Sequence, residues 1–372
     1  MYDLIGARYP NSKEFPDALW AAALLRDSLG KDAEAAALFE RLAGAYPQFP
    51  EIDAVLYHWG WALADLGQKK ESSELFDRLR REHPQSAYRA DALFRLAQRA
   101  LDKKAYQQAQ QLAADVLAAE PSERLLENAL YIEGQVASAQ QQWDEARRAF
   151  QTLVADHPKS SLRRMAEYGI AEAAFRQDDY QRAGELLDRL VQQTPESPEP
   201  WLGVVHLRQA QVLCHQKKWD EAYGIASTIA TEYPQFEEQY EVDYVIGRCL
   251  SNRGEFGPAR EAYRRVIQSP QGEKTETAAK AQLMIAESYY HQENYPQALR
   301  EYLALEILYD YPVWQAAAVF QAAKCHEMLG EWKQAADQYA RLLADYPNTS
   351  FLAEAQERLQ AAKKRLAAQP TS

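Results

Sequence analysis

The chain has 372 residues, of which 54 are acidic and 42 basic, giving a net charge of −12. Nucleic-acid-binding domains present a basic face, so we expect no nucleic-acid partner. The hydrophobic content of 47% is enough for a folded core. The longest apolar runs last only a few residues, far short of the roughly 18 to 20 that span a bilayer, so no transmembrane segment is expected in this chain.

The composition favours an all-α fold. Only 15 residues are glycine, and Ala, Leu, Glu, Gln and Arg, which are good helix formers, dominate the sequence. The irregular patches are short and lie at residues 192–200 and 268–277.

A repeat of 37 or 39 residues runs through the sequence. Its clearest marker is a small residue at nine positions: Ala35, Ser72, Ala109, Ala146, Ala183, Ala222, Ala259, Ala298 and Ala335. Twelve residues before each marker stands Gly or Ala: Ala23, Gly60, Ala97, Gly134, Ala171, Ala210, Gly247, Ala286 and Ala323. Apolar residues between these columns recur at three- and four-residue spacing, which predicts two helices in each repeat. Small residues let two helices approach closely, so the two columns predict where the helices cross.

In chain order, residues 1–10 resemble the end of a second helix whose first helix is missing, so we expect the chain to begin inside a longer array. Residues 11–347 hold the nine repeats, and residues 348–372 are expected to form a C-terminal capping helix and tail. An export signal could lie upstream of the chain as given.

Start and stop signals agree with this period. Proline closes the second helix of most repeats. Glycines suited to a helix C-cap stand in the turn between the two helices of four repeats: Gly30, Gly67, Gly254 and Gly330. Hydroxyl residues two positions after a closing proline are expected to be helix N-caps: Ser12, Ser86, Ser160 and Thr349.

These columns resemble the tetratricopeptide repeat (TPR) family. The marks are the Gly/Ala column, the small residue twelve positions later, the closing proline, and a ring or Leu four residues after the small residue: Phe39, Phe76, Phe150, Leu187, Tyr263, Tyr302 and Tyr339. The resemblance implies a right-handed α-solenoid of about nine helix pairs. The period is longer than the usual 34 residues, and with the Tyr-Pro closings it resembles the bacterial cell-envelope branch of the family.

No constellation of residues points to catalysis. The chain lacks the short motifs of nucleotide-binding, hydrolase and zinc-protease sites. Cys214, Cys249 and Cys325 are odd in number and widely spaced, so we expect packing cysteines rather than disulfides or metal ligands. His83 and His157 take the place of Tyr before a closing proline, which is a structural position. We therefore expect no enzyme, no cofactor and no metal site.

The resemblance also implies which first-helix positions face a partner-binding groove. Three residues before the Gly/Ala column, seven of nine positions hold a ring, an arrangement we call the aromatic ladder: Trp20, Tyr57, Phe94, Tyr131, Tyr168, Tyr244 and Phe320. The polar candidates nearby change from acidic to basic along the chain: Asp17, Asp65, Asp91, Asn128, Arg248, Lys280 and Lys324. Such regularity suits packing between repeats as well as recognition, and both interpretations stay open.

The sequence therefore predicts a non-enzymatic scaffold that binds protein or peptide partners along a concave groove, in a bacterial cell-envelope complex. Two alternatives remain. One is a regulatory or targeting module of a larger enzyme or secretion complex. The other is a self-assembling structural repeat protein, although a monomer is favoured. The partner's identity cannot be inferred from these residues.

Overall fold

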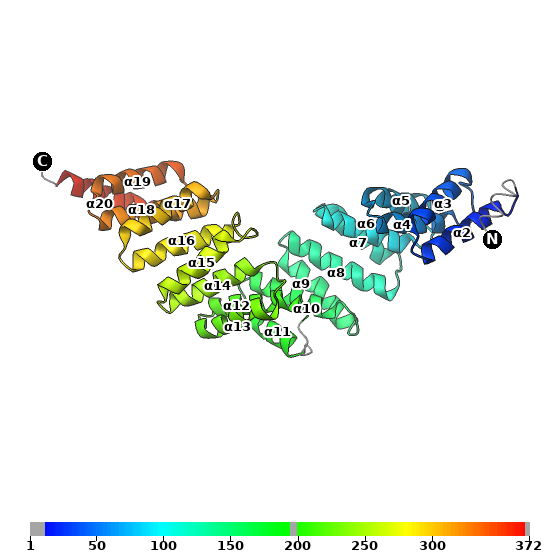
Figure 1. The fold of residues 1–372 in the computed structure, drawn as a ribbon, viewed down its shortest axis with the longest axis horizontal. Helices are drawn as coiled ribbons and strands as arrows, with labels where there is room; N and C mark the ends of the chain where they lie inside the picture. Colours follow the sequence, from blue (N-terminus) through cyan, green and yellow to red (C-terminus); the bar gives the residue numbers. More distant parts are fainter. Residues whose placement is uncertain (1–11, 194–198, 369–372) are drawn as a thin grey trace. The chain divides into compact units, whose positions relative to one another are not determined.

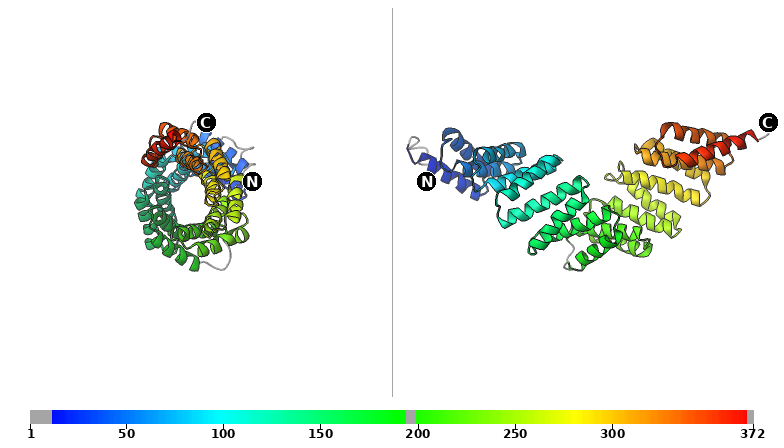
Figure 2. Two further views of the ribbon diagram at one scale, coloured as in Figure 1. Left: turned by 90° about the vertical axis from the view of Figure 1, so that its left-hand side faces the viewer. Right: turned by 180° about the vertical axis from the view of Figure 1, so that it is seen from behind.

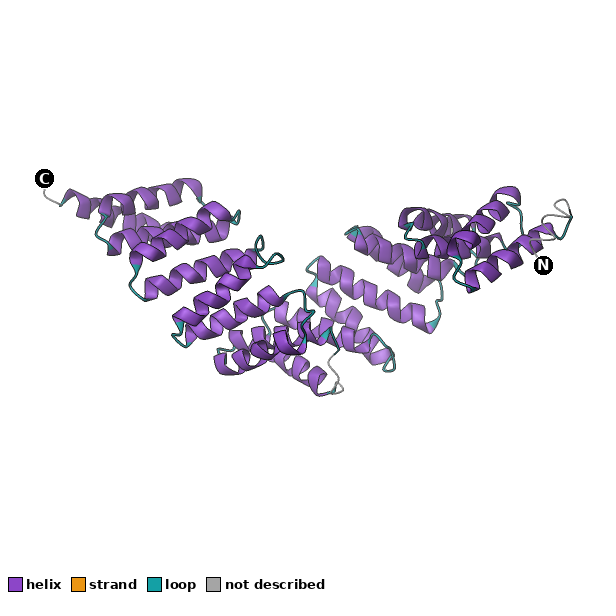
Figure 3. Ribbon diagram, viewed as in Figure 1, coloured by secondary structure: helices purple, strands orange, loops and turns teal. Residues whose placement is uncertain are grey.

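The structure is a computed structural model that describes residues 12–193 and 199–368. These residues form 19 α-helices and no β-strand (Figure 3), so the predicted all-α fold is confirmed. The predicted remnant at residues 1–10 lies outside the described residues. In the described part of the chain, no helix is both long and apolar enough to cross a membrane.

The chain divides into two compact units, residues 1–179 and residues 180–372. Figure 1 labels the helices along the chain. The helices of unit 1 are α2 (Phe15–Ser28), α3 (Asp32–Ala45), α4 (Ile52–Asp65), α5 (Lys69–Glu82), α6 (Arg89–Asp102), α7 (Tyr106–Ala118), α8 (Glu123–Ala139), α9 (Trp143–Asp156) and α10 (Arg163–Arg176).

Unit 2 holds the remaining ten helices. They are α11 (Tyr180–Gln192), α12 (Leu202–His215), α13 (Trp219–Glu232), α14 (Gln239–Asn252), α15 (Phe256–Gln268), α16 (Glu276–His291), α17 (Tyr295–Leu308), α18 (Pro312–Met328), α19 (Trp332–Asp345) and α20 (Leu352–Ala367). Helix α20 packs against α19 through Ala355, Leu359 and Ala362, and its role as a cap stays a prediction.

Within each unit, every helix packs on the next one in the chain, so that the helices form a two-layered stack (Figure 2). The even-numbered helices from α2 to α18 are the first helices of the repeats. Among the described residues, the more extensive contacts between alternate helices of unit 1 join α2 to α4, α6 to α8 and α8 to α10, all of them first helices. In unit 2, α12, α14, α16 and α18 contact one another in the same way. The more closely spaced layer of a curved stack is its inner layer, so the first helices line the concave side of each unit.

The Gly/Ala and small-residue columns meet as the sequence predicts. The Ser72 hydroxyl donates a hydrogen bond to the Gly60 carbonyl oxygen at 2.7 Å, which only a close helix approach allows. Gly134 has no room for a Cβ atom, because the Phe150 ring of α9 occupies that space. The ring four positions after the small-residue column is thus the group that the glycines accommodate, and it fills the core of the repeat.

The turn between the two helices of a repeat uses the left-handed backbone conformation. Gly30, Gly67, Gly254 and Gly330 all have φ between 67° and 77°, as expected for helix C-terminal glycines. The same turn in other repeats is formed by non-glycine residues with φ between 57° and 62°: Lys104, Gln141, Asp178, Lys217 and Glu293. These five residues accept a modest strain that glycine avoids.

The predicted N-caps are wrong in detail. The hydroxyls of Ser86, Ser160 and Thr349 accept hydrogen bonds from the backbone N–H groups two residues ahead, at 3.1 to 3.4 Å. The helices begin later, and the residues at their N-cap positions form no side-chain cap. The hydroxyls therefore stabilise the preceding turn rather than the first turn of the helix.

Candidate partner-binding surface

The aromatic ladder of unit 1 packs against the second helices of the same repeats. The rings of Trp20, Tyr57 and Tyr131 lie 5.8, 6.3 and 5.6 Å, centroid to centroid, from the rings of Phe39, Phe76 and Phe150 respectively. These three ladder side chains and that of Tyr168 are only partly buried, whereas Phe94 is buried. Trp20, Tyr57 and Tyr131 therefore have a packing role, and these three rings and Tyr168 also keep part of their surface exposed.

The ladder of unit 2 is built in the same way. Tyr244 lies 5.9 Å from Tyr263, and Phe320 lies 5.9 Å from Tyr339 and stacks on Phe351 at 4.7 Å. Phe320 is buried and Tyr244 is partly exposed. The positions that hold Leu in place of a ring, Leu207 and Leu283, are buried too.

The structure brings several predicted residues together around an arginine that the sequence analysis does not name. We call this group the Arg95 cluster, and its members are Tyr57, Trp61, Asp91, Phe94 and Arg95. The Arg95 guanidinium lies 4.0 Å from the centroid of the Trp61 ring and 5.1 Å from that of Phe94. Its Nε atom lies 4.0 Å from Oδ2 of Asp91, one helical turn earlier on α6. The cluster thus combines rings, a cation and a carboxylate on neighbouring first helices.

The electrostatics of the Arg95 cluster reflect its partial burial. Burial, and then the carboxylate of Asp91, raises the pKa of the Tyr57 hydroxyl to about 12. Burial also lowers the pKa of Arg95, and the negative charges of Asp91 and Asp65 oppose that shift. Among the described residues, Oδ2 of Asp91 and Nε of Arg95 are buried and have no hydrogen-bond partner. Because both atoms are buried, a bound partner would meet the exposed parts of the rings and of the guanidinium rather than these two atoms.

The other polar candidates of unit 1 lie beside this cluster or away from it. Asp65 is exposed and acts on Arg95 through its charge. The Asn128 amide donates to the Arg124 carbonyl oxygen of its own helix at 2.6 Å. Asp17 is exposed on α2 and is not part of the cluster.

The basic candidates of unit 2 each lie over a ring. Arg248 lies 5.7 Å from the Trp219 ring, and Lys324 lies 5.5 Å from Tyr290 and 5.7 Å from Phe320. Cations over rings are attracted by the negative π face, so these side chains are held in place.

Lys280 makes two contacts that fix its position. Its ammonium lies 5.3 Å from the Trp314 ring and 3.1 Å from the Glu276 carboxylate. The Trp314 indole N–H donates to that carboxylate at 2.8 Å. This hydrogen bond, and then Lys280, lowers the pKa of Glu276. The positive charge predicted at Lys280 is therefore largely balanced by its neighbour.

A second surface, absent from the predicted site, lies at the turn between α17 and α18. The side chains of Ile307, Leu308 and Val313 are 80%, 67% and 73% exposed. Most other repeats have Gly, Ala or a polar residue at the position of Ile307, for example Gly44, Arg81 and Thr231. An apolar residue where the other repeats have a small or polar one was therefore the sign of this surface in the sequence. Apolar side chains clustered on a surface commonly mark a contact with another protein.

A pocket lies beside this turn. It has a volume of about 630 Å³ and is lined by residues of α18 and of the loop after α19, including Val313, Trp314, Tyr346 and Phe351. A pocket of about 560 Å³ occupies the equivalent place at α12 and the loop after α13, where Trp201 corresponds to Trp314. The repeat architecture therefore forms the same kind of pocket twice in unit 2.

All three cysteines are buried and free, as expected for packing residues. The Sγ atoms of Cys214 and Cys249 lie 3.8 Å apart, on the adjacent first helices α12 and α14. Their separation in the sequence gave no sign of this proximity.

Comparison with known proteins identifies the family. A model described as a tetratricopeptide repeat-like domain matches residues 123–284, and a tetratricopeptide repeat model matches residues 17–48, 54–86 and 317–349. Together the two models match more than half of the chain. The chain belongs to the tetratricopeptide repeat family.

Solved structures show the same fold. A tetratricopeptide repeat protein from Parabacteroides merdae ATCC 43184 is 14% identical, with a TM-score of 0.51, over 73% of this chain and 98% of that chain. The apo form of RapI is 12% identical, with a TM-score of 0.56, over 75% of this chain and 86% of that chain. None of the curated proteins matches the sequence. At these identities the likeness concerns the fold alone.

Membership of this family also bears on the class of function. Tetratricopeptide repeats generally mediate protein–protein interactions and scaffolding, and their fold is typically a non-catalytic one.

Proposed function

We propose that this protein is a non-enzymatic scaffold that binds protein or peptide partners on the concave side of its first-helix layers. The observation that carries the proposal is the Arg95 cluster, where the partly buried rings of Tyr57 and Trp61 lie beside a cation and a carboxylate. Trp, Tyr and Arg are the residues most enriched at binding hot spots. Rigid rings also lose little conformational entropy when a partner binds.

The chemistry of the cluster suits a peptide segment. The Arg95 guanidinium can donate to a backbone carbonyl or a carboxylate, while Asp91 can accept from a backbone N–H or a basic side chain. Tyr57 and Trp61 supply apolar area beside these groups, and the Tyr88 ring stacks on Tyr57 at 4.5 Å and holds it in place. An extended chain crossing α4 and α6 would meet both kinds of group.

Affinity capture from the native organism tests this role. The immobilised chain is compared with Arg95→Ala and Arg95→Lys, because Lys keeps the charge but loses the planar donor fork. We expect a partner retained by the wild type to be lost by Arg95→Ala and weakened by Arg95→Lys. The melting temperature of each variant is measured so that loss of fold is recognised.

Arg148→Ala is the matched control, because Arg148 is an exposed arginine on the second helix α9 that pairs with Glu145 at 2.8 Å. It should retain the partner. If folded Arg95→Ala captures every protein that the wild type captures, the cluster is not the binding site.

The location in a bacterial cell envelope is part of the same proposal and rests on the long repeats and their Tyr-Pro closings. Fractionation of the native organism is the test, with the protein expected among envelope or periplasmic proteins. Recovery with cytoplasmic markers alone would count against it. The self-assembly alternative predicts concentration-dependent oligomers, and analytical ultracentrifugation showing a monomer at high concentration would remove it.

A further inference from the structure

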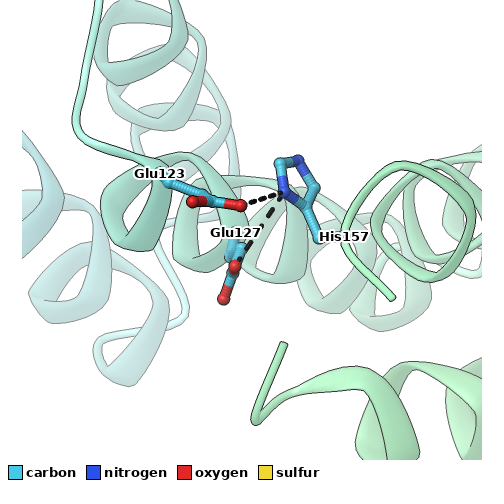
Figure 4. A group of neighbouring side chains, drawn as sticks. All are labelled: Glu123, Glu127 and His157. Atoms are coloured by element: carbon cyan, nitrogen blue, oxygen red, sulfur yellow. Dashed lines mark ion pairs between the residues drawn. The ribbon is translucent and has the colours of Figure 1, made fainter. Parts of the chain in front are cut away.

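Three side chains that the binding surface does not use converge where the fourth repeat begins and closes (Figure 4). Glu123 is the first residue of α8 and Glu127 follows one helical turn later, so both carboxylates lie on one face of the helix. His157 follows the last residue of α9, and its backbone N–H donates to the Leu153 carbonyl oxygen. The ends of two packed helices thus position all three groups.

The spacing of these groups is that of metal ligands rather than of hydrogen-bonded partners. Nδ1 of His157 lies 3.7 Å from Oε1 of Glu123 and 3.9 Å from Oε1 of Glu127. All three ligand atoms lie within 4.8 Å of one another. These separations exceed the range of a hydrogen bond. Two ligands at tetrahedral angles on one zinc ion would be about 3.4 Å apart, a few tenths of an ångström less than the two distances from the imidazole nitrogen.

The His157 imidazole is nearly buried, and the two glutamate carboxylates lie at ion-pair distance from its Nδ1 atom (Figure 4). The His157 side chain is 11% exposed. No group in the described residues hydrogen-bonds its Nδ1, although that atom is buried. A buried polar atom without a partner is costly, and an ion between the imidazole and the carboxylates would remove that cost.

The Glu127 carboxylate is also held in its orientation by a hydrogen bond to its second oxygen. The Ser160 hydroxyl donates to Oε2 of Glu127 at 2.7 Å, which leaves Oε1 directed at His157. Hydrogen bonds of this kind to ligating carboxylates are typical of metal sites, where they fix the ligand's orientation. Glu127 is itself largely buried, with 15% of its side chain exposed, while Glu123 is open to solvent.

This combination of residues is not a general feature of the repeat. His83 occupies the place of His157 in the second repeat, but the positions equivalent to Glu123 and Glu127 hold Phe49 and Asp53. In other repeats the histidine is replaced by tyrosine, as at Tyr46, Tyr233 and Tyr346. A ring before the closing proline is thus common among the repeats. Only the fourth repeat combines a histidine at this position with two glutamates at the positions of Glu123 and Glu127.

We propose that Glu123, Glu127 and His157 bind a divalent transition-metal ion of the zinc type, with water completing its coordination. The imidazole nitrogen selects such an ion over Mg²⁺ and Ca²⁺, which prefer oxygen ligands alone. The bound ion would tie the start of α8 to the end of α9.

Calorimetric titration of the metal-free full chain with ZnCl₂ tests the site, with MgCl₂ and CaCl₂ as separate arms. We expect one zinc ion per chain whose binding weakens at least tenfold in His157→Tyr and in Glu127→Gln. Ser160→Ala, which removes the hydroxyl that orients Glu127 and also accepts from the Leu162 N–H, should weaken it by about tenfold. Zinc should raise the melting temperature of the wild type and not that of Glu127→Gln, because the ion binds only the folded site.

The controls separate this site from other surface histidines and carboxylates. His157→Tyr installs the residue found at this position in several other repeats, so its fold should be preserved, and Glu127→Gln gives an independent answer if it is not. His83→Tyr makes the same substitution in the second repeat, which lacks the two glutamates, and should leave zinc binding unchanged. Unaltered zinc affinity in both His157→Tyr and Glu127→Gln overturns the proposal. So does binding of Mg²⁺ or Ca²⁺ as tightly as zinc.

Discussion

At the scale of residues, close packing between glycine and a ring holds the repeats together. Phe150 of α9 occupies the space that a Cβ atom would need at Gly134 of α8 and also at Gly169 of α10. Phe76 and Tyr263 meet Gly60 and Gly247 in the same way. One ring therefore joins its own repeat to the next, and the absence of a side chain at the glycine is part of the packing.

Replacing Gly134 with Leu should destabilise the protein, because the new side chain would collide with the Phe150 ring. Overpacking of a filled core costs about 1 to 3 kcal/mol and sometimes more. Urea denaturation followed by circular dichroism measures the change.

Gly44→Ala is the matched control, since nothing lies within 4 Å of the Cβ position at Gly44. It lies inside helix α3, where alanine is favoured over glycine by up to about 1 kcal/mol. Equal effects of the two substitutions would contradict the assigned packing.

The Tyr57 hydroxyl should lose its proton at a higher pH than the hydroxyl of an ordinary tyrosine. Because its pKa of about 12 in the folded protein exceeds the usual value near 10, the folded state holds the proton more tightly than the unfolded state does. This group contributes stability below pH of about 10 that is lost as the pH rises towards 12. Titration of ¹³C-labelled tyrosine by NMR measures the pKa directly.

The Asp91→Asn variant separates the causes of that shift. Removing the carboxylate should lower the pKa of Tyr57 but leave it above 10, because burial is the larger cause. An unchanged pKa would show that Asp91 does not act on this hydroxyl.

At the scale of elements, the α17–α18 turn differs from the other repeat closings by its exposed apolar side chains. Ile307 and Val313 bury little area in the folded chain. The double variant Ile307→Ser and Val313→Ser should therefore change the free energy of unfolding by no more than about 0.5 kcal/mol per site. Urea denaturation measures this change.

Leu305→Ala provides the contrast on the same helix, because that side chain is fully buried. It should cost about 2 to 5 kcal/mol. If the serine variants cost as much, the turn is buried in solution, for example against another copy of the chain.

The sequence predicts the helices well because each repeat carries its own start, crossing and stop signals. The crossing at Gly134 and the turn glycines follow from local chemistry, and both are seen in the structure. The N-caps were misplaced because a serine two residues after proline can satisfy a turn as easily as a helix end. Ser160 shows the difficulty: its hydroxyl lies near Leu162 N–H and also donates to Glu127, 33 residues earlier.

At the scale of the whole molecule, the packing of helices brings together side chains that lie far apart in the sequence. The Arg95 cluster draws on the first helices α4 and α6 of two repeats, and the Glu123, Glu127 and His157 group draws on both helices, α8 and α9, of one repeat. Such groups depend on which side chains meet across helices, which a repeat period alone does not specify. The sequence therefore predicted Tyr57, Asp91 and Phe94 by position, but not the arginine that joins them.

The most direct test of the proposed scaffold role is site-specific photo-crosslinking in the native organism. A benzophenone amino acid is placed at Trp61 in the Arg95 cluster and, as a control, at Thr152, an exposed residue of the second helix α9. We expect a discrete protein adduct from position 61 and none of the same mass from position 152. Adducts from position 152 alone, or none from position 61 while the protein remains folded, would contradict binding on the first-helix layer.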